Sequence, residues 1–345
     1  MMKNPFWNPE QRRLRALWRL AIQALLSGVA IAVLGAAAGL ALRAWLVSRP
    51  GGTALLGDPA ALQRAMLSYP LYRLVNMGIT LAAIVGSVAL AGRFLDRRRF
   101  ADFGFHLDRA WWLDLAFGMA LGALLMGSIF LVEWAAGWLT ISGTLHAPGT
   151  QAFLPAILGA LLGFVAVGLY EELLSRGYQL RNLAEGLNGR LLGERGAVVL
   201  AWLLSSSFFG ILHAGNPNAT PVSTANLVVA GLFLGLGYTL TGELAIPIGL
   251  HIGWNFCQGN VFGFPVSGTQ AGATIIAVAQ GGPELWTGGA FGPEAGLIGL
   301  AAILAGSVLI VFWVRARRGQ ATLWRPLAQA PSPLDGREPA AESHS

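Results

Sequence analysis

The stretch "EELLSR" places two adjacent carboxylates, Glu171 and Glu172, directly after residues 151–170, which carry no charged side chain. Arg176 follows Glu172 at four residues, so on a helix the two share a face and can form an ion pair. Glu171 points about 100° away from Glu172 and has no partner at that spacing. A carboxylate left unpaired in an apolar bundle can act as a general base toward water. The alternative interpretation is a charged cluster that ends a membrane span.

Two further stretches bring nitrogen-bearing side chains. "SSSFFGILH" ends at His213, which by itself is typical of a satisfied core or interfacial histidine. "HIGWN" places His251 and Asn255 four residues apart, on one face of a helix. An imidazole and an amide on that face can donate hydrogen bonds to a developing oxyanion. The alternative is a hydrogen-bonded pair that joins two helices.

The three stretches together predict one polar cavity, because polar groups inside a membrane must face protein or water. A carboxylate, two imidazoles and an amide suffice to activate water and attack a carbonyl. The nucleophile motif GxSxG and the zinc-protease motif HExxH are both absent. A metal held by Glu171, His213 and His251 stays open as an alternative, because Glu and His also suit zinc.

The composition is that of a polytopic membrane protein. Of the 345 residues, 54% are hydrophobic and only 12% are charged, against roughly 25% in soluble domains. The net charge of +6 comes from arginines at the ends of apolar runs, which indicates topology and headgroup anchors rather than nucleic-acid binding. Cys257 is the only cysteine, which excludes an intramolecular disulfide and a cysteine-based zinc cluster.

We therefore predict an all-α fold, a polytopic membrane helix bundle of about eight transmembrane helices with an intramembrane polar cavity. The predicted spans are residues 20–47, 71–95, 113–138, 153–178, 197–214, 222–241, 244–262 and 294–314.

The predicted organisation has three parts: a basic cytoplasmic segment over 1–19, a transmembrane domain over 20–318 and a disordered tail over 319–345. Arginines concentrate on alternate connections, which predicts that both termini are cytoplasmic. The longest loop, residues 263–293, has no role that the sequence indicates.

Counting spans places Glu171 toward the cytoplasmic end of the fourth span and His213 near the outer end of the fifth. If both touch one water molecule, either the fifth span extends past Pro217 or the fourth span is longer than 153–178.

The three motifs in this order resemble those of the CPBP family of intramembrane proteases, the CAAX-prenyl-protease and bacteriocin-processing group also called the ABI family. "EELLSRG" is similar to EExxxR, "FGILH" from Phe209 to His213 to FxxxH, and "HIGWN" to HxxxN. The resemblance covers roughly residues 93–262, which would be the protease core.

The resemblance implies a role for each motif residue. Glu171 would activate the hydrolytic water together with His213, and His251 and Asn255 would form the oxyanion hole. Glu172 would be held by Arg176. The family is regarded as glutamate-dependent, so no metal or other cofactor is expected. The residues expected to support the site are Glu172, Arg176 and Phe209.

The function predicted is that of an intramembrane endopeptidase that hydrolyses a peptide bond by glutamate-activated water. Its partners would be the lipid bilayer and a peptide, prenylated or membrane-protein substrate, with no nucleic acid. The expected location is a prokaryotic plasma membrane. The alternatives are a non-catalytic membrane scaffold or bacteriocin-immunity factor on the same fold, and a transporter with a proton relay.

Overall fold

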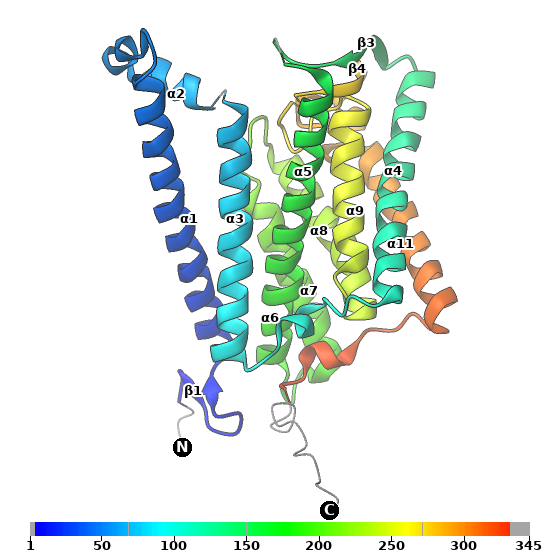
Figure 1. Ribbon diagram of the computed structural model, residues 1–345. Helices are drawn as coiled ribbons and strands as arrows, with labels where there is room; N and C mark the ends of the chain where they lie inside the picture. The colour runs from blue at the N-terminus through cyan, green and yellow to red at the C-terminus, as the bar shows by residue number, and fades with distance from the viewer. Residues whose placement is uncertain (1–3, 68, 150, 271, 332–345) are drawn as a thin grey trace, which may run out of the picture.

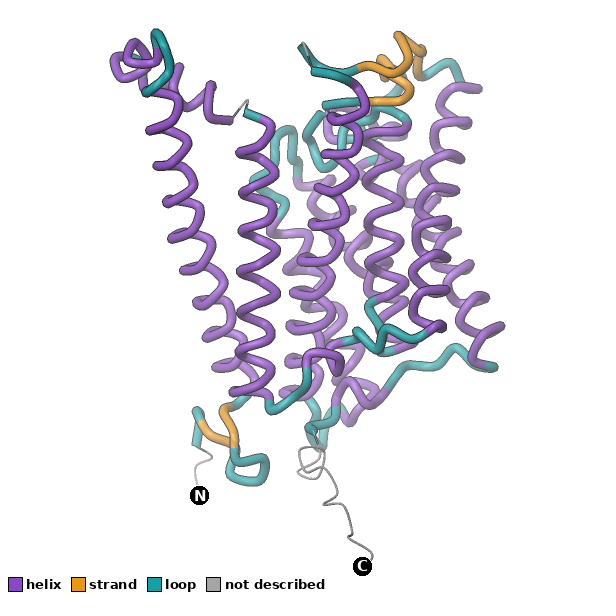
Figure 2. The backbone as a smooth tube through the Cα atoms, in the orientation of Figure 1, coloured by secondary structure: helices purple, strands orange, loops and turns teal. Residues whose placement is uncertain are grey.

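The computed structural model describes residues 4–67, 69–149, 151–270 and 272–331 as a bundle of helices. The long helices lie side by side, and the first and last described residues lie at one end of the bundle, called here the terminal end (Figure 1). The opposite end, which carries strands β3 and β4, is called the distal end. Figure 2 shows that strands of the described chain form only small sheets at these two ends. The predicted all-α membrane bundle is therefore confirmed.

Seven helices of the described chain are long and apolar enough to cross a membrane. They are α1 (Ala16–Val47), α3 (Pro70–Ala91) continued by η2 (Gly92–Asp96), α4 (Arg109–Ala135), α5 (Phe153–Glu172) continued by η4 (Leu173–Leu180) and α6 (Arg181–Leu187), α7 (Gly193–Leu212), α8 (Pro221–Thr241) and α11 (Leu297–Arg318).

The eighth predicted span, residues 244–262, corresponds to α9 (Ala245–Phe256) continued by η5 (Cys257–Val261). This helix is shorter than the other seven, and residues 245–254 are all buried. It therefore runs through the interior of the bundle rather than along its lipid-facing surface.

The shorter elements lie at the ends of the bundle. They are β1 (Trp7–Asn8), β2 (Arg13–Leu14), η1 (Gly52–Gly57), α2 (Pro59–Leu67), η3 (Phe100–Phe103), β3 (Leu139–His146), β4 (Thr274–Gln280), α10 (Glu284–Thr287), η6 (Gly289–Phe291), η7 (Pro293–Ala295) and η8 (Arg325–Ala328).

Glycines let α9 reach the centre of the bundle. A Cβ on Gly249 or Gly253 would lie 2.1 or 2.3 Å from a backbone oxygen of α4, and Gly118 and Gly122 of α4 are equally close to the backbone of α9. Small residues permit such close approach of membrane helices, which packing then stabilises. The α4–α9 contact thus fixes the helix that carries His251.

The loop over residues 263–293 has structure that the sequence did not indicate. Its strand β4 pairs antiparallel with β3, in a register from Leu139 opposite Gln280 to His146 opposite Thr274. Gln280 also donates from Nε2 to the carboxylate of Glu133, at 2.8 Å. Glu133 is fully buried near the end of α4, and its bond to Gln280 joins α4 to this sheet.

The C-terminal segment is ordered further than predicted. The sequence predicted disorder from residue 319, whereas Leu327 and Ala328 are buried beneath α6 and α7 at the terminal end. Trp324 donates its backbone N–H to the carbonyl of Thr239 at 2.8 Å. Residues 332–345 of the predicted tail lie outside the described residues.

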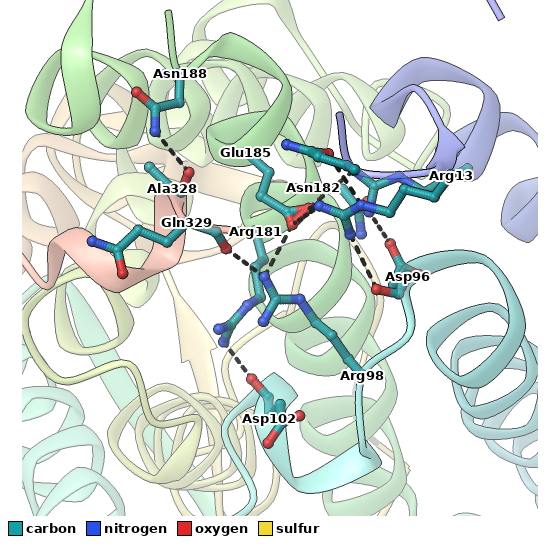
Figure 3. A network of polar contacts seen from close by, with 12 residues as sticks. Arg13, Asp96, Arg98, Asp102, Arg181, Asn182, Glu185, Asn188, Ala328 and Gln329 are labelled. Carbon is teal, nitrogen blue, oxygen red and sulfur yellow. Dashed lines mark hydrogen bonds and ion pairs between the residues drawn. The ribbon is translucent and has the colours of Figure 1, made fainter. Parts of the chain in front are cut away.

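A buried charged network joins four segments at the terminal end (Figure 3). The carboxylate of Glu185 on α6 accepts hydrogen bonds from Arg13, Arg19 and Arg98, at 2.9–3.0 Å. Arg19 also pairs with Asp96 at the end of η2. Burial lowers the pKa of Arg13 and of Arg98, and the nearby Glu185 carboxylate opposes this shift. The network lets α6 continue as a helix although it carries charged residues.

We expect Glu185→Ala to lower the stability of the bundle strongly, because three buried guanidinium groups lose their shared carboxylate. Removing one partner of a buried ion pair costs about 3–5 kcal/mol. The measurement is thermal unfolding of the purified protein in detergent. Arg64→Ala is the matched control, since it removes only the exposed pair with Asp58, worth about 0–1 kcal/mol. Equal melting temperatures for the two variants would contradict the role given to the network.

Candidate active site

The stretch "EELLSR" lies within one long, continuous helix. Segments α5, η4 and α6 form one continuous span from Phe153 to Leu187. Glu171 therefore lies 16 residues from its terminal end (187 − 171), about 24 Å at 1.5 Å per residue. His213 lies 20 residues from the start of α7 (213 − 193), about 30 Å from the same end. The two depths are similar because the fourth span is longer than the predicted 153–178.

Glu172 is fully buried and bonded on two sides. Its Oε1 accepts a hydrogen bond from Arg176 Nη1 at 2.8 Å, as the four-residue spacing predicted. Arg176 Nη2 donates to the carbonyl of Gly231 on α8 at 2.9 Å. This pair therefore ties the π-helical segment η4 to α8. Such π-helical insertions are frequent at functional sites.

His251 is the second partner of Glu172. Its Nδ1 lies 2.7 Å from Glu172 Oε1, and a carboxylate accepts, so the ring donates through Nδ1–H. The other ring nitrogen, Nε2, lies 3.9 Å from Glu171 Oε2, which is beyond hydrogen-bond length. The sequence predicted only one partner for Glu172, namely Arg176. No local signal could reveal the second, because His251 lies 79 residues away in the chain.

Phe209 and His213 form the third side of the site. His213 follows the last residue of α7, and its Nδ1 lies 2.8 Å from the carbonyl of Phe209. Since that carbonyl accepts, Nε2 of a neutral His213 ring carries a free lone pair. The ring of Phe209 lies 4.7 Å from His213, 4.6 Å from the guanidinium of Arg176 and 6.3 Å from His251. Phe209 thus fills the space between Arg176 and the two histidines.

Glu171, His213, His251 and Asn255 line one cavity of about 1010 Å³. They come from α5, from the end of α7 and from α9. Glu171 keeps 22% of its side chain exposed there, whereas Glu172 behind it is inaccessible. The structure therefore brings the three sequence motifs to a single cavity, with Glu171 as the carboxylate that faces it.

The loop over 266–270 forms the distal rim of this cavity, and side chains hold it by its backbone. Asn216 donates to the carbonyl of Ser267 at 3.0 Å, and Asn218 to that of Gly268 at 3.1 Å. Glu294 accepts hydrogen bonds from the backbone N–H and the hydroxyl of Ser267. This gives the 263–293 segment a role: it shapes the mouth of the cavity.

Glu294 is the buried acid of this rim. Burial raises the pKa of its carboxyl group, and hydrogen bonds from Gln258 and Ser267 act in the opposite direction. The group lies outside the membrane-spanning helices, in η7.

No group of three or more His, Cys, Asp or Glu side chains in the described chain is arranged to hold a metal ion. In the metal alternative, Glu171, His213 and His251 would be the ligands. One ring nitrogen of each histidine is already bonded, to Phe209 and to Glu172, so only the two Nε2 atoms are free to bind.

Residues 152–257 match the family model described as type II CAAX prenyl endopeptidase Rce1-like. The resemblance to the CPBP family is confirmed. The matched segment contains all seven site residues predicted from the motifs, within the 93–262 region of the resemblance. Its likeness to a protease family supports a membrane enzyme that cleaves peptide bonds. No significant match was found among curated proteins or solved structures.

We expect Arg176→Ala to destabilise the protein, because it leaves Glu172 buried without its cation. The loss should be about 3–5 kcal/mol. Glu171→Ala should change stability by less than about 1 kcal/mol, since it removes a part-exposed carboxylate with no short bond. Thermal unfolding of both variants in detergent makes the comparison. A Glu171→Ala variant as unstable as Arg176→Ala would show that Glu171 is also structural.

We expect Glu294→Gln to flatten the pH dependence of stability. Since the folded-state pKa is raised, the folded state holds its proton more tightly than the unfolded chain. Stability then falls as pH rises from the unfolded value, about 4.3, through the folded one. The amide keeps the acceptor for Ser267 but cannot ionise. Melting temperatures between pH 4 and pH 8 test this, and parallel curves for the two proteins would refute it.

Proposed function

We propose that this protein is an intramembrane endopeptidase in which Glu171 activates the water that cleaves the peptide bond. The observation that carries the proposal is the shared cavity. Four groups able to act on water and on a carbonyl line it, and Glu171 is the acid among them that lacks a short bond.

The proposed reaction begins with a water molecule between Glu171 and His213. Glu171 takes a proton from this water as its oxygen attacks the carbonyl carbon of the scissile bond. His213 supports the water through the lone pair on Nε2, because its Nδ1 proton is engaged by Phe209.

The tetrahedral intermediate then carries a negative oxygen. Asn255 donates to it from its amide, and His251 donates from Nε2 when the ring is protonated. Glu172 orients His251 through Nδ1, and Arg176 holds Glu172 in place. When the carbon–nitrogen bond breaks, Glu171 returns its proton to the departing amine. The products are a carboxylic acid and an amine, and Glu171 is regenerated.

Glu171→Ala should lower kcat/KM by about 10²–10⁴-fold, the usual contribution of a general base. The purified protein in liposomes would be incubated with a mixture of single-span peptides, and the products would be quantified by mass spectrometry. Glu284→Ala is the control, because it removes an exposed carboxylate at the distal end. Equal cleavage by Glu171→Ala and the unmodified protein would eliminate the glutamate mechanism. A complete lack of cleavage by both would favour the non-catalytic scaffold.

A further inference from the structure

Glu294 is a buried acid that belongs to none of the three motifs. It lies in η7, beyond the segment 152–257 that matches the protease family. Only 3% of the residue is exposed, yet it forms part of the cavity wall. Its carboxyl group accepts hydrogen bonds from Ser267, Gln258 and Trp254, which are all neutral. Because a buried carboxyl group needs such donors, Glu294 holds the segments that supply them in fixed places.

Ser267 has a backbone conformation that residues other than glycine rarely adopt. Its φ is 45°, in the left-handed region. Such a conformation persists only where the surroundings enforce it, and it is frequent at active sites. Glu294 binds both the backbone N–H and the hydroxyl of Ser267, and the flanking Val266 and Thr269 exchange backbone hydrogen bonds of 2.8 and 2.9 Å. These contacts fix the direction of the Ser267 carbonyl.

The turn that follows His213 binds this carbonyl. Since α7 ends at Leu212, the position of His213 depends on the residues that come after it. Asn216 donates its backbone N–H to the carbonyl of His213 at 3.0 Å, and its side-chain amide donates to the carbonyl of Ser267 at 3.0 Å. Asn216 therefore connects His213 to the loop that Glu294 holds.

This turn and the rim loop are also packed in direct contact. A Cβ on Gly268 would lie 1.7 Å from the carbonyl oxygen of Pro217, so the two backbones touch. Asn218, whose φ of 59° is also left-handed, donates to the carbonyl of Gly268 at 3.1 Å. A shift of the rim loop would therefore displace the turn that carries His213.

On its other side, Glu294 contacts the helix of His251. Gln258 lies in η5, which continues α9, and it donates hydrogen bonds to Glu294 and to the carbonyl of Pro265. The rim loop therefore lies between the helix that supplies the proposed oxyanion donors and the turn that supplies His213. Glu294 binds both neighbours of this loop, so it sets how far apart the two halves of the site lie.

We propose that Glu294 is a positioning residue for the hydrolysis. Through Ser267 and Asn216 it holds His213 where the imidazole can bind the attacking water, and it does so without contacting that water. This inference rests on the proposed function. It adds to the site a residue that lies outside the matched family segment.

The first test observes the ring of His213 by NMR and needs no cleavage. The histidine rings of the purified protein would be labelled with nitrogen-15, and the His213 signals would be identified by their loss in His213→Gln. Glu294→Ala and Asn216→Ala should each shift these signals. Glu294→Gln keeps an acceptor for Ser267 and should leave them in place. Unshifted His213 signals in both alanine variants would overturn the proposal.

Two variants elsewhere in the chain control for a general loss of order. Glu133→Gln changes another buried acid near the distal end, which binds Gln280 and does not line the cavity. Asn188→Ala removes an amide-to-carbonyl bond of the same 3.0 Å length, to Ala328 at the terminal end. Both should leave the His213 signals in place. Equally large shifts in these controls would also overturn the proposal, because they would show a general response of the bundle.

The second test separates turnover from substrate binding. In the peptide assay described for Glu171, Glu294→Ala and Asn216→Ala should each lower kcat about tenfold with KM unchanged, because a displaced His213 impairs the chemical step. The double variant should be no slower than the slower single variant, since both substitutions break one series of contacts. Losses that multiply in the double variant, or a change in KM alone, would contradict the proposal. Melting temperatures would verify that each variant is folded.

The two tests distinguish this inference from the proposed function. If the His213 signals shift as expected in a protein that cleaves nothing, the link between Glu294 and His213 is supported and the proposed function is not. If cleavage requires Glu171 but Glu294→Ala cleaves at the unmodified rate, the inference is overturned and the proposed function stands.

Discussion

The site depends on a single buried carboxylate that is shared by two partners. Glu172 cannot be solvated where it lies, so its charge has to be balanced by protein groups. Arg176 and His251 meet this need from two different helices, and Arg176 reaches on to the carbonyl of Gly231. One acid therefore joins α5, α8 and α9. Because Glu172 takes these bonds, Glu171 next to it is left facing the cavity.

Within this dipeptide, Glu172 holds neighbouring helices together, and Glu171 is the acid that faces the cavity. Consecutive residues on a helix point about 100° apart, so one acid faces the protein and the other faces open space. The glycines of α4 and α9 complete the arrangement from the far side, since they bring the His251 helix close enough to bond Glu172. Larger residues at those glycines would move His251 away from Glu172 and weaken the bond between them.

The local chemistry of the site was readable in the sequence. The four-residue spacings predicted the Glu172–Arg176 pair, and the apolar runs predicted the helix bundle. The sequence did not reveal the Glu172–His251 bond, because nothing in the chain marks partners 79 residues apart. It also ended the fourth span too early. The predicted span ended at residue 178, whereas buried arginines from β2, from α1 and from the segment after η2 bind Glu185 and allow the helix to continue.

The buried acids at the terminal end and Glu171 in the middle of its helix have different surroundings, and this difference accounts for where the cavity lies. At the terminal end, Glu185 and Asp96 meet arginines directly, and the described side chains around them are packed. At the level of Glu171, the acid instead meets open space and a histidine nitrogen at 3.9 Å, a gap that one water molecule can bridge. The described residues that line the cavity lead from Glu171 to the distal loops, which gives water a path to the acid from that side. Buried side chains close the cavity toward the terminal end. Its distal loops leave room for water, which is the reactant that hydrolysis consumes.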